Sequence, residues 1–157
     1  MEVRFICVGK SKEDYFAKAC AEYKKMLSRF CRVCEFELPD APLQNVKSAA
    51  EEAEALKKEG ARVLEKLKGF VIVLDIGGKK MDSVAFAHTL ERAFAQGGST
   101  VSFVVGSSLG LSEEIKKRAD LRLSFSDMTL PHRLFRVVLY EQVFRAFKII
   151  NQETYHK

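Results

Sequence analysis

Three short loops are the parts of this sequence whose residue types best suit ligand chemistry. Residues 75–79, 106–110 and 125–131 each follow an apolar run, and the first two contain glycines that allow positive φ angles and close approach of the backbone to a ligand. Neither glycine loop matches GxGxxG or the P-loop pattern, which argues against both of those nucleotide sites. Each loop alone could be a plain tight turn, whereas three loops at one sheet edge favour a ligand site.

The third loop leads directly into a long helix that begins near His132. Pro131 suits the opening of a helix, because an N–H in the first turn would have no partner. The junction of a strand's carboxyl end with a helix's amino end is a frequent ligand position in α/β sheets. His132 is therefore a candidate functional residue, although a histidine in a first turn can also be a cap or a packing residue.

The last three residues of the chain form a second candidate site. Tyr155, His156 and Lys157 place an aromatic ring, an imidazole and an ammonium group in succession. These groups suit contact with a polyanion or with a nucleic-acid base better than they suit a protein core.

The helix predicted over residues 132–150 is apolar over half of its circumference or more. Two explanations remain open: the helix is buried within its own monomer, or it forms a symmetric subunit interface. Arg136 lies within the apolar arc, and a buried guanidinium needs a partner. That partner is either a carboxylate, such as Glu141 of a neighbouring chain, or an anionic substrate.

The overall composition is that of an ordinary globular protein. With 157 residues, the chain is expected to form one domain spanning residues 1–157, and its net charge of +5 weakly favours an anionic partner. No apolar run approaches the roughly 18–20 residues that span a bilayer. The first ten residues are too short and too polar for a signal peptide. We therefore expect a cytoplasmic protein with no membrane partner.

The four cysteines do not form a complete metal-site pattern. Cys31 and Cys34 have the spacing of a zinc or redox pair, but the sequence has no second such pair and no nearby histidine. We interpret all four cysteines as structural thiols, kept reduced in the cytosol, and predict no metal.

Strand and helix patterns alternate throughout the chain, which predicts an α/β domain with a mainly parallel sheet. A short helix capped by Ser112 is also expected. The other elements follow from apolar periodicity, with strands near residues 3–7, 33–38, 70–74, 101–105 and 121–126, and helices over residues 13–30, 48–67, 83–96 and 132–150.

A set of motifs, in this order, resembles one family over essentially the whole chain. The motifs are Val8-Gly9-Lys10, residues 74–79, residues 106–111, residues 124–133, Arg136-Val137-Val138 and the terminal Tyr155-His156-Lys157. Together they resemble the minimal SPOUT-class methyltransferases that modify a pseudouridine of 23S rRNA, the ribosomal large subunit methyltransferase H family. Residues 123–132 and the Tyr-His-Lys terminus are the specific part of this resemblance.

The resemblance implies a single-domain SPOUT fold with a C-terminal trefoil knot, a homodimer, and S-adenosylmethionine bound in the knotted loops. At Ser107 the sequence departs from the family, in which many members have glycine. Apolar side chains of the site are suited to packing an adenine, while loop amides and carbonyls can read its polar edge. The cofactor contacts carried over by motif fall on Leu74, Gly106, Phe125, Ser126, Asp127, Met128, Thr129 and Leu130.

The activity implied by the resemblance is methylation of N3 of a pseudouridine in the helix 69 stem-loop of 23S rRNA, on assembled ribosomes. No residue stands out as a strong general base. Two alternatives remain open: a methyltransferase of another RNA site, and a non-catalytic ribosome-binding module that has kept the fold. The candidate catalytic residues are His132, Arg136, Tyr155 and His156, and the candidates for RNA contact are Lys10, Arg136, Tyr155, His156 and Lys157.

Overall fold

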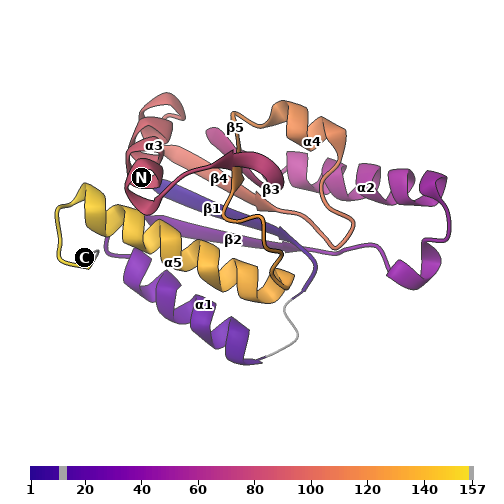
Figure 1. Cartoon of the computed structure of the whole chain (residues 1–157), viewed down its shortest axis with the longest axis horizontal. Coiled ribbons are helices and arrows are strands. Elements are labelled where there is room, and N and C mark those ends of the chain that lie inside the picture. Colours follow the sequence, from indigo (N-terminus) through magenta and orange to yellow (C-terminus); the bar gives the residue numbers. More distant parts are fainter. Residues whose placement is uncertain (11–13, 156–157) are drawn as a thin grey trace.

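The centre of the protein is a five-stranded parallel sheet with the strand order β2-β1-β4-β3-β5 (Figure 1). The structure is a computed structural model and describes residues 1–10 and 14–155. The strands are β1 (Glu2–Val8), β2 (Arg32–Leu38), β3 (Phe70–Lys80), β4 (Thr100–Val105) and β5 (Leu121–Ser124). The helices are α1 (Asp14–Leu27), α2 (Ala49–Leu64), α3 (Ser83–Gln96), α4 (Glu113–Arg118) and α5 (His132–Ile150), with a 3-10 turn, Leu43–Asn45, before α2. The α/β architecture with a parallel sheet is confirmed.

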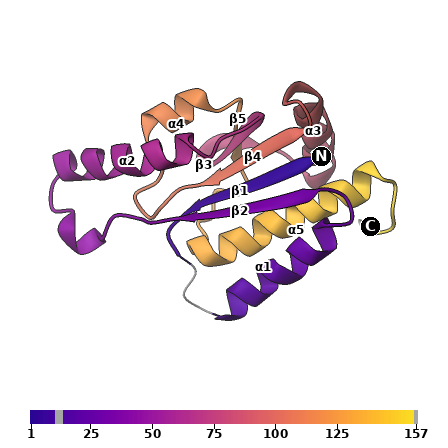
Figure 2. The ribbon, with the colours of Figure 1, turned by 180° about the vertical axis from the view of Figure 1, so that it is seen from behind.

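Helices cover both faces of the sheet, as Figure 1 and, from behind, Figure 2 show. The side chains of α1, α3 and α5 form one apolar cluster with one face of the strands, and those of α2 and α4 form a second cluster with the other face. Phe103 and Val104 of β4 belong to different clusters, because successive side chains of a strand point to opposite faces. The central strand β4 is consequently buried along its whole length.

Three helices begin where the sequence offers a capping side chain. Ser48 accepts a hydrogen bond from the N–H of Glu51 at 3.2 Å, and Asp82 accepts one from Ala85 at 2.7 Å. Ser112, predicted as a cap, accepts from the N–H of Ile115 at 3.3 Å. These side-chain oxygens satisfy N–H groups that have no partner within the helix.

Two helices and one strand end earlier than their apolar patterns predict. α1 ends at Leu27 rather than at residue 30, α2 at Leu64 rather than at residue 67, and β5 at Ser124 rather than at residue 126. The apolar residues beyond these ends, such as Phe30, pack against the core from turns. Burial alone therefore extends the helical pattern past the last helical residue.

The strand β3 is longer than the sequence predicts. Residues 75–79, expected to be a loop, belong to a strand that continues to Lys80. Leu74 and Lys79 both lie opposite Leu123 of β5, so the residues between them bulge out of the pairing. Gly78 permits this path, because a Cβ there would lie 2.7 Å from the carbonyl oxygen of Arg122. The glycines that resemble a turn in the sequence thus serve a close approach between two strands.

The wide apolar surface of α5 is covered largely within its own chain. α5 contacts both α1 and α3 and lies on the sheet (Figure 1). The ring of Phe147 stacks on Phe30 with centroids 5.5 Å apart, and Tyr140 stacks on Phe5 at 3.8 Å. This arrangement favours the first of the two explanations, burial within the monomer. The buried residues of α5 are Arg136, Leu139, Tyr140, Val143, Phe144, Ala146 and Phe147.

Two features implied by the resemblance lie beyond what these elements show. The trefoil knot and the homodimer remain predictions. Among the helices of residues 1–10 and 14–155, none combines the length and the apolar character needed to cross a bilayer.

Candidate functional site

A cavity of about 600 Å³ opens where the carboxyl ends of β3, β4 and β5 meet. The strand order places these three ends side by side, so the bulged part of β3 and the loops after β4 and β5 converge on one space. The volume lies within the range of about 300–1,000 Å³ that is typical of small-molecule sites. Seven of the eight expected cofactor contacts line the cavity: Leu74, Gly106, Phe125, Ser126, Met128, Thr129 and Leu130.

The eighth expected contact, Asp127, is not among the residues that line the cavity. Its carboxylate instead forms an ion pair with Lys80 of β3. This pair links the third loop to the extended end of β3, next to the cavity.

The loop of residues 106–110 closes tightly on itself. The N–H of Gly110 donates to the carbonyl oxygen of Ser107 at 2.9 Å, and Gly110 has a φ of +92°. A Cβ on Gly106 would lie only 2.3 Å from the carbonyl oxygen of Gly110. Glycine is therefore required at residue 106 by the loop itself, and the loop presents its backbone to the cavity.

A charged pair fixes the wall formed by β3 and β5. Arg122 donates to Oδ2 of Asp75 through Nε at 2.9 Å and through Nη2 at 2.6 Å, and the N–H of Gly77 donates to Oδ1 at 3.2 Å. Burial raises the pKa of Asp75, but these hydrogen bonds outweigh it, so the pKa lies below its ordinary value. Asp75 is consequently an ionised anchor for the bulge of β3.

The third loop presents apolar side chains to solvent at the edge of the cavity. Met128 is 79% exposed and Leu130 is 38% exposed, although both are large apolar residues. Ser126 shapes this loop, since its hydroxyl accepts a hydrogen bond from the N–H of Met128 at 2.9 Å. Exposed apolar groups gathered around a cavity are typical of a surface that is covered by a ligand or a partner.

His132 lies at the edge of the cavity, in the first turn of α5, where the sequence placed it. Burial lowers its pKa, and the positive charge of Arg136 lowers it further. The imidazole is therefore neutral at pH 7 and has a nitrogen that can accept a proton.

Arg136 is occupied within its own chain. Its side chain is almost fully buried, and Nη1 donates to Glu37 at 2.9 Å while Nη2 donates to the carbonyl oxygens of Gly9 at 2.5 Å and Val8 at 3.3 Å. Its partner is thus the end of β1 together with a carboxylate of β2, rather than Glu141 of another chain. The structure favours a structural role for Arg136 over the expected contact with substrate.

Replacing Arg136 by methionine is expected to lower the free energy of unfolding by roughly 2–3 kcal/mol, because two buried carbonyl groups lose their donor. Urea unfolding followed by circular dichroism would measure this change. Arg29→Met is the matched control, since Arg29 is exposed and its ion pair with Glu153 spans 3.8 Å. Equal stability of the Arg136→Met variant and the wild type would contradict the structural role.

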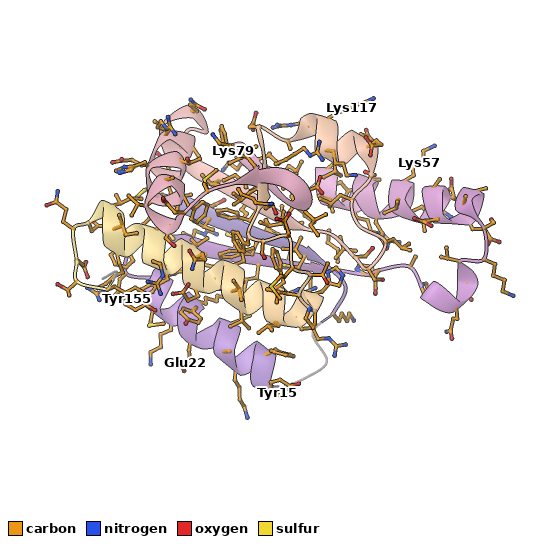
Figure 3. The ribbon with its side chains drawn as sticks, in the orientation of Figure 1. Tyr15, Glu22, Lys57, Lys79, Lys117 and Tyr155 are labelled. Atoms are coloured by element: carbon orange, nitrogen blue, oxygen red, sulfur yellow. The ribbon has the colours of Figure 1, made fainter. Side chains whose placement is uncertain are left out.

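Tyr155 lies far from the cavity of the same chain. Tyr155 folds back on α5, with its ring edge-on to Phe144 at 5.1 Å and the guanidinium of Arg145 at 4.8 Å from its centre. Figure 3 shows Tyr155 beside α1, at the C-terminal end of α5. Along α5, Phe144 and His132 are about 18 Å apart. Tyr155, one of the predicted catalytic residues, therefore does not meet His132 within one chain.

Three predicted RNA-contact residues remain: Lys10, His156 and Lys157. Lys10 is exposed just beyond β1. His156 and Lys157 lie outside the described residues.

Several residues of the cavity wall were not found by sequence reasoning. Glu52 and Leu56 of α2 line the cavity, as do Glu113 and Lys116 of α4. The charges of α2 look like a solvated helix face in the sequence, and no local signal marks two of its residues as neighbours of a loop some fifty residues away. Asp75, by contrast, belonged to a loop that the sequence did identify.

Three of the four thiols are held in the protonated form by burial. Burial raises the pKa of Cys7 and of Cys31 to about 12, and that of Cys20 to about 11, so these groups are protonated at neutral pH. Within residues 1–10 and 14–155, no three metal-ligating side chains are grouped closely enough to hold an ion.

A parallel sheet with a cavity of this size at three neighbouring strand ends is typical of α/β proteins that bind a small molecule at the carboxyl ends of their strands. Comparison with known proteins specifies the family. A family model described as "Predicted SPOUT methyltransferase" matches residues 1–156. The chain belongs to the SPOUT methyltransferase family.

Curated relatives match over their whole length. The chain is 46% identical over 159 aligned residues, covering 100% of both chains, to ribosomal RNA large subunit methyltransferase H 1 of Clostridium perfringens. The same identity and coverage hold for ribosomal RNA large subunit methyltransferase H of Carboxydothermus hydrogenoformans and of Streptococcus equi.

Solved structures of methyltransferases share the fold at low sequence identity. A probable methyltransferase from Bordetella pertussis has a TM-score of 0.58 and 16% identity, with 92% of this chain and 93% of that chain covered. A putative methyltransferase from Legionella pneumophila, solved with the cofactor SAM, has a TM-score of 0.53 and 11% identity, with 94% and 66% covered. At these identities the likeness establishes the fold alone.

Proposed function

We propose that this protein is a cytoplasmic, S-adenosylmethionine-dependent methyltransferase of large-subunit ribosomal RNA. Its substrate position is N3 of a pseudouridine in the helix 69 stem-loop of 23S rRNA, on assembled ribosomes. The observation that carries the proposal is the cavity built by the three loops, in a chain that is 46% identical over its full length to relatives named ribosomal RNA large subunit methyltransferase H.

The residues of the cavity fit this cofactor. Leu74, Met128 and Leu130 provide apolar surface for a flat adenine, and the backbone of residues 106–110 provides N–H and carbonyl groups for its polar edge. Glycine at residue 106 allows this loop to close, because a Cβ there would lie 2.3 Å from the carbonyl oxygen of Gly110. A pocket of this volume, apolar at its rim and lined by peptide groups within, suits a nucleoside cofactor.

The chain's own residues have three tasks in the proposed reaction. The bound cofactor supplies an electrophilic methyl group, so the protein must orient the base, exclude competing nucleophiles and take up the imide proton of N3. His132 is the proposed proton acceptor, because it is neutral at pH 7 and lies at the edge of the cavity. Tyr155 is proposed to stack on an unpaired base.

The distance between the tail and the cavity supports a homodimer. Because Tyr155 docks at the far end of α5, it can act on a base near His132 only in the cavity of a second chain. We therefore propose that each cavity is completed by the tail of the partner chain. Lys10, His156 and Lys157 are proposed to contact RNA phosphates there.

Single-turnover methylation of ribosomes that lack the modification tests the proposal. Mass mapping should locate one added methyl group on the pseudouridine-containing fragment of helix 69, and ribosomes without that pseudouridine should remain unmodified. Methylation of a different nucleotide would support a methyltransferase of another RNA site. Failure of the wild-type protein to bind S-adenosylmethionine in calorimetry would support a non-catalytic ribosome-binding module.

The pH dependence of the same reaction tests His132. Because its pKa lies below the ordinary 6.5, the rate is expected to stay constant at and above pH 7 and to fall as the pH drops through the lowered pKa. His132→Gln is expected to lower the rate at pH 7 about 100-fold, within the range for general base catalysis, and to remove the acid limb. An unchanged acid limb in this variant would assign the titration to another group.

A further inference from the structure

The loop of residues 106–110 is held by a carboxylate buried beneath it. Glu59 of α2 is 4% exposed and forms no ion pair within the described residues. Its Oε2 accepts a hydrogen bond from the hydroxyl of Ser107 at 2.8 Å, and its Oε1 accepts one from the N–H of Ala41 at 2.8 Å. One side chain of α2 thus joins the loop after β4 to the segment that follows β2.

A buried carboxylate without a cation is a costly feature. Ionised groups lose their hydration on burial, and only hydrogen bonds of good geometry offset that loss. Here each carboxylate oxygen receives one hydrogen bond of 2.8 Å, from the hydroxyl of Ser107 and from the N–H of Ala41. Such a group fixes the relative positions of its two donors more firmly than apolar packing would.

Ser107 connects Glu59 to the rest of the loop. The residue is 3% exposed, and its hydroxyl, while donating to Glu59, also accepts from the N–H of Leu109 at 3.3 Å. Its carbonyl oxygen accepts from the N–H of Gly110 at 2.9 Å. The N–H groups of Leu109 and Gly110 therefore both donate to Ser107, and the hydroxyl of Ser107 is in turn bonded to Glu59 of α2.

The helix α2 itself is set directly against the loop's end. A Cβ on Gly60 would lie 2.6 Å from the hydroxyl oxygen of Ser112, so the helix approaches residues 111–112 as closely as glycine allows. Because Glu59 is next to Gly60 in this closely packed helix, its backbone is held in place. The carboxylate can therefore shift little if the loop of residues 106–110 moves.

We propose that Glu59 and Ser107 form a positioning pair that holds the loop of residues 106–110 in the conformation that binds S-adenosylmethionine. The inference rests on the proposed function only in the identity of the ligand. Neither side chain is assigned a contact with the cofactor. A loop with glycine at residues 106 and 110 has many accessible backbone conformations, and fixing it in advance reduces the entropy lost on binding.

Ser107→Ala is the first test, with calorimetric titration of S-adenosylmethionine and steady-state kinetics on ribosomes. The Kd and the KM for the cofactor are expected to rise about tenfold, as for the loss of a hydrogen bond to a charged group, while kcat changes less than about twofold. Amide hydrogen exchange is expected to accelerate in the free protein at Leu109, whose acceptor oxygen the substitution removes, and at Gly110, whose acceptor carbonyl belongs to a residue that has lost its anchor.

Glu59→Gln and Glu59→Leu separate hydrogen bonding from packing. Glutamine keeps an oxygen for the N–H of Ala41 and an amide that can donate to the hydroxyl oxygen of Ser107. The cofactor Kd is therefore expected to rise by about threefold or less in Glu59→Gln. In Glu59→Leu it should rise about tenfold or more, because both hydrogen bonds disappear.

Ser102→Ala is the matched control, because Ser102 is another buried serine, on the same strand β4 that leads into the loop. Its hydroxyl donates to the carbonyl oxygen of Lys68 at 2.7 Å and accepts from the N–H of Lys68 at 3.0 Å, near the amino end of β3. This variant should lose stability as Ser107→Ala does, with the wild-type cofactor Kd.

The outcomes distinguish the inference from the function on which it rests. A wild-type protein that does not bind S-adenosylmethionine overturns the proposed function. A wild-type protein that binds it, with the same Kd in Ser107→Ala and Ser102→Ala, overturns the positioning pair. A raised Kd in Ser107→Ala alone, together with faster exchange at Leu109 and Gly110, supports it.

Discussion

Replacing Gly106 by alanine is expected to weaken S-adenosylmethionine binding about 100-fold or more, with the fold retained. The added Cβ would lie 2.3 Å from the carbonyl oxygen of Gly110 and 3.0 Å from the side chain of Leu111, so the turn must open. The opened turn would move peptide groups that face the cavity, and a loss of about 2.7 kcal/mol or more in binding corresponds to this factor. Calorimetric titration would measure it, with circular dichroism as the check on folding.

Gly98→Ala is the matched control for this substitution. Gly98 lies before the amino end of β4, has a φ of +61°, and would point its Cβ into open space. The variant should lose some stability, because alanine is strained at positive φ, and should bind the cofactor as the wild type does. If Gly106→Ala also binds normally, the loop of residues 106–110 is not part of the cofactor site.

Removing residues 155–157 is expected to abolish methyl transfer while leaving the cofactor Kd within about twofold of the wild-type value. The cavity should be unaffected, because the docked Tyr155 lies about 18 Å along α5 from His132. The truncation removes the edge-on contact with Phe144 and the contact with Arg145, together worth about 1 kcal/mol of stability at this partly exposed position. Single-turnover methylation and calorimetry on one preparation would measure both effects.

Mixing two inactive variants tests how the tail acts. The truncated chain keeps an intact cavity, and Gly106→Ala keeps an intact tail, so a mixed dimer has one complete site. Activity is expected to return after the two proteins are unfolded and refolded together, and sedimentation should show a species of twice the chain's mass. Full activity of the truncated protein alone would mean that the tail has no part in the site. Absence of any recovery, with dimers present, would contradict a shared site.

Much of the architecture follows from local pattern. The alternation of apolar runs and amphipathic segments identified the strands and the long helices, and Ser112 was recognised as a cap, because these features depend on neighbours within a few residues. The three loops were placed at one edge because parallel strands share a direction. The cavity lined by Leu74, Gly106 and Phe125 follows from this geometry.

Where local pattern gave a wrong answer, a partner distant in the sequence was responsible. Residues 75–79 read as a loop because glycines usually mark turns, but here Gly78 passes against Arg122 of a strand that comes 44 positions later in the chain. Elsewhere the local pattern left two explanations open: the wide apolar surface of α5 is compatible with burial in the monomer or with a subunit interface, and α1 and α3 cover much of it within the chain. Neither contact has a signature in the residues that immediately surround it.

The sequence by itself determined the class of fold and the loops after β4 and β5, because periodicity and turn chemistry are local properties. The expected cofactor contacts came from the family resemblance of the motifs, and they remain predictions. Only the tertiary structure decided what the buried charged groups do. Arg136 is paired with Glu37, 99 residues away, and Glu59 accepts from Ser107, 48 residues away. The tertiary structure also separated Tyr155 from His132. A charged residue within an apolar pattern indicates that it needs a partner when buried. Which residue becomes that partner depends on how remote segments pack, and this packing is driven by burial of the whole core.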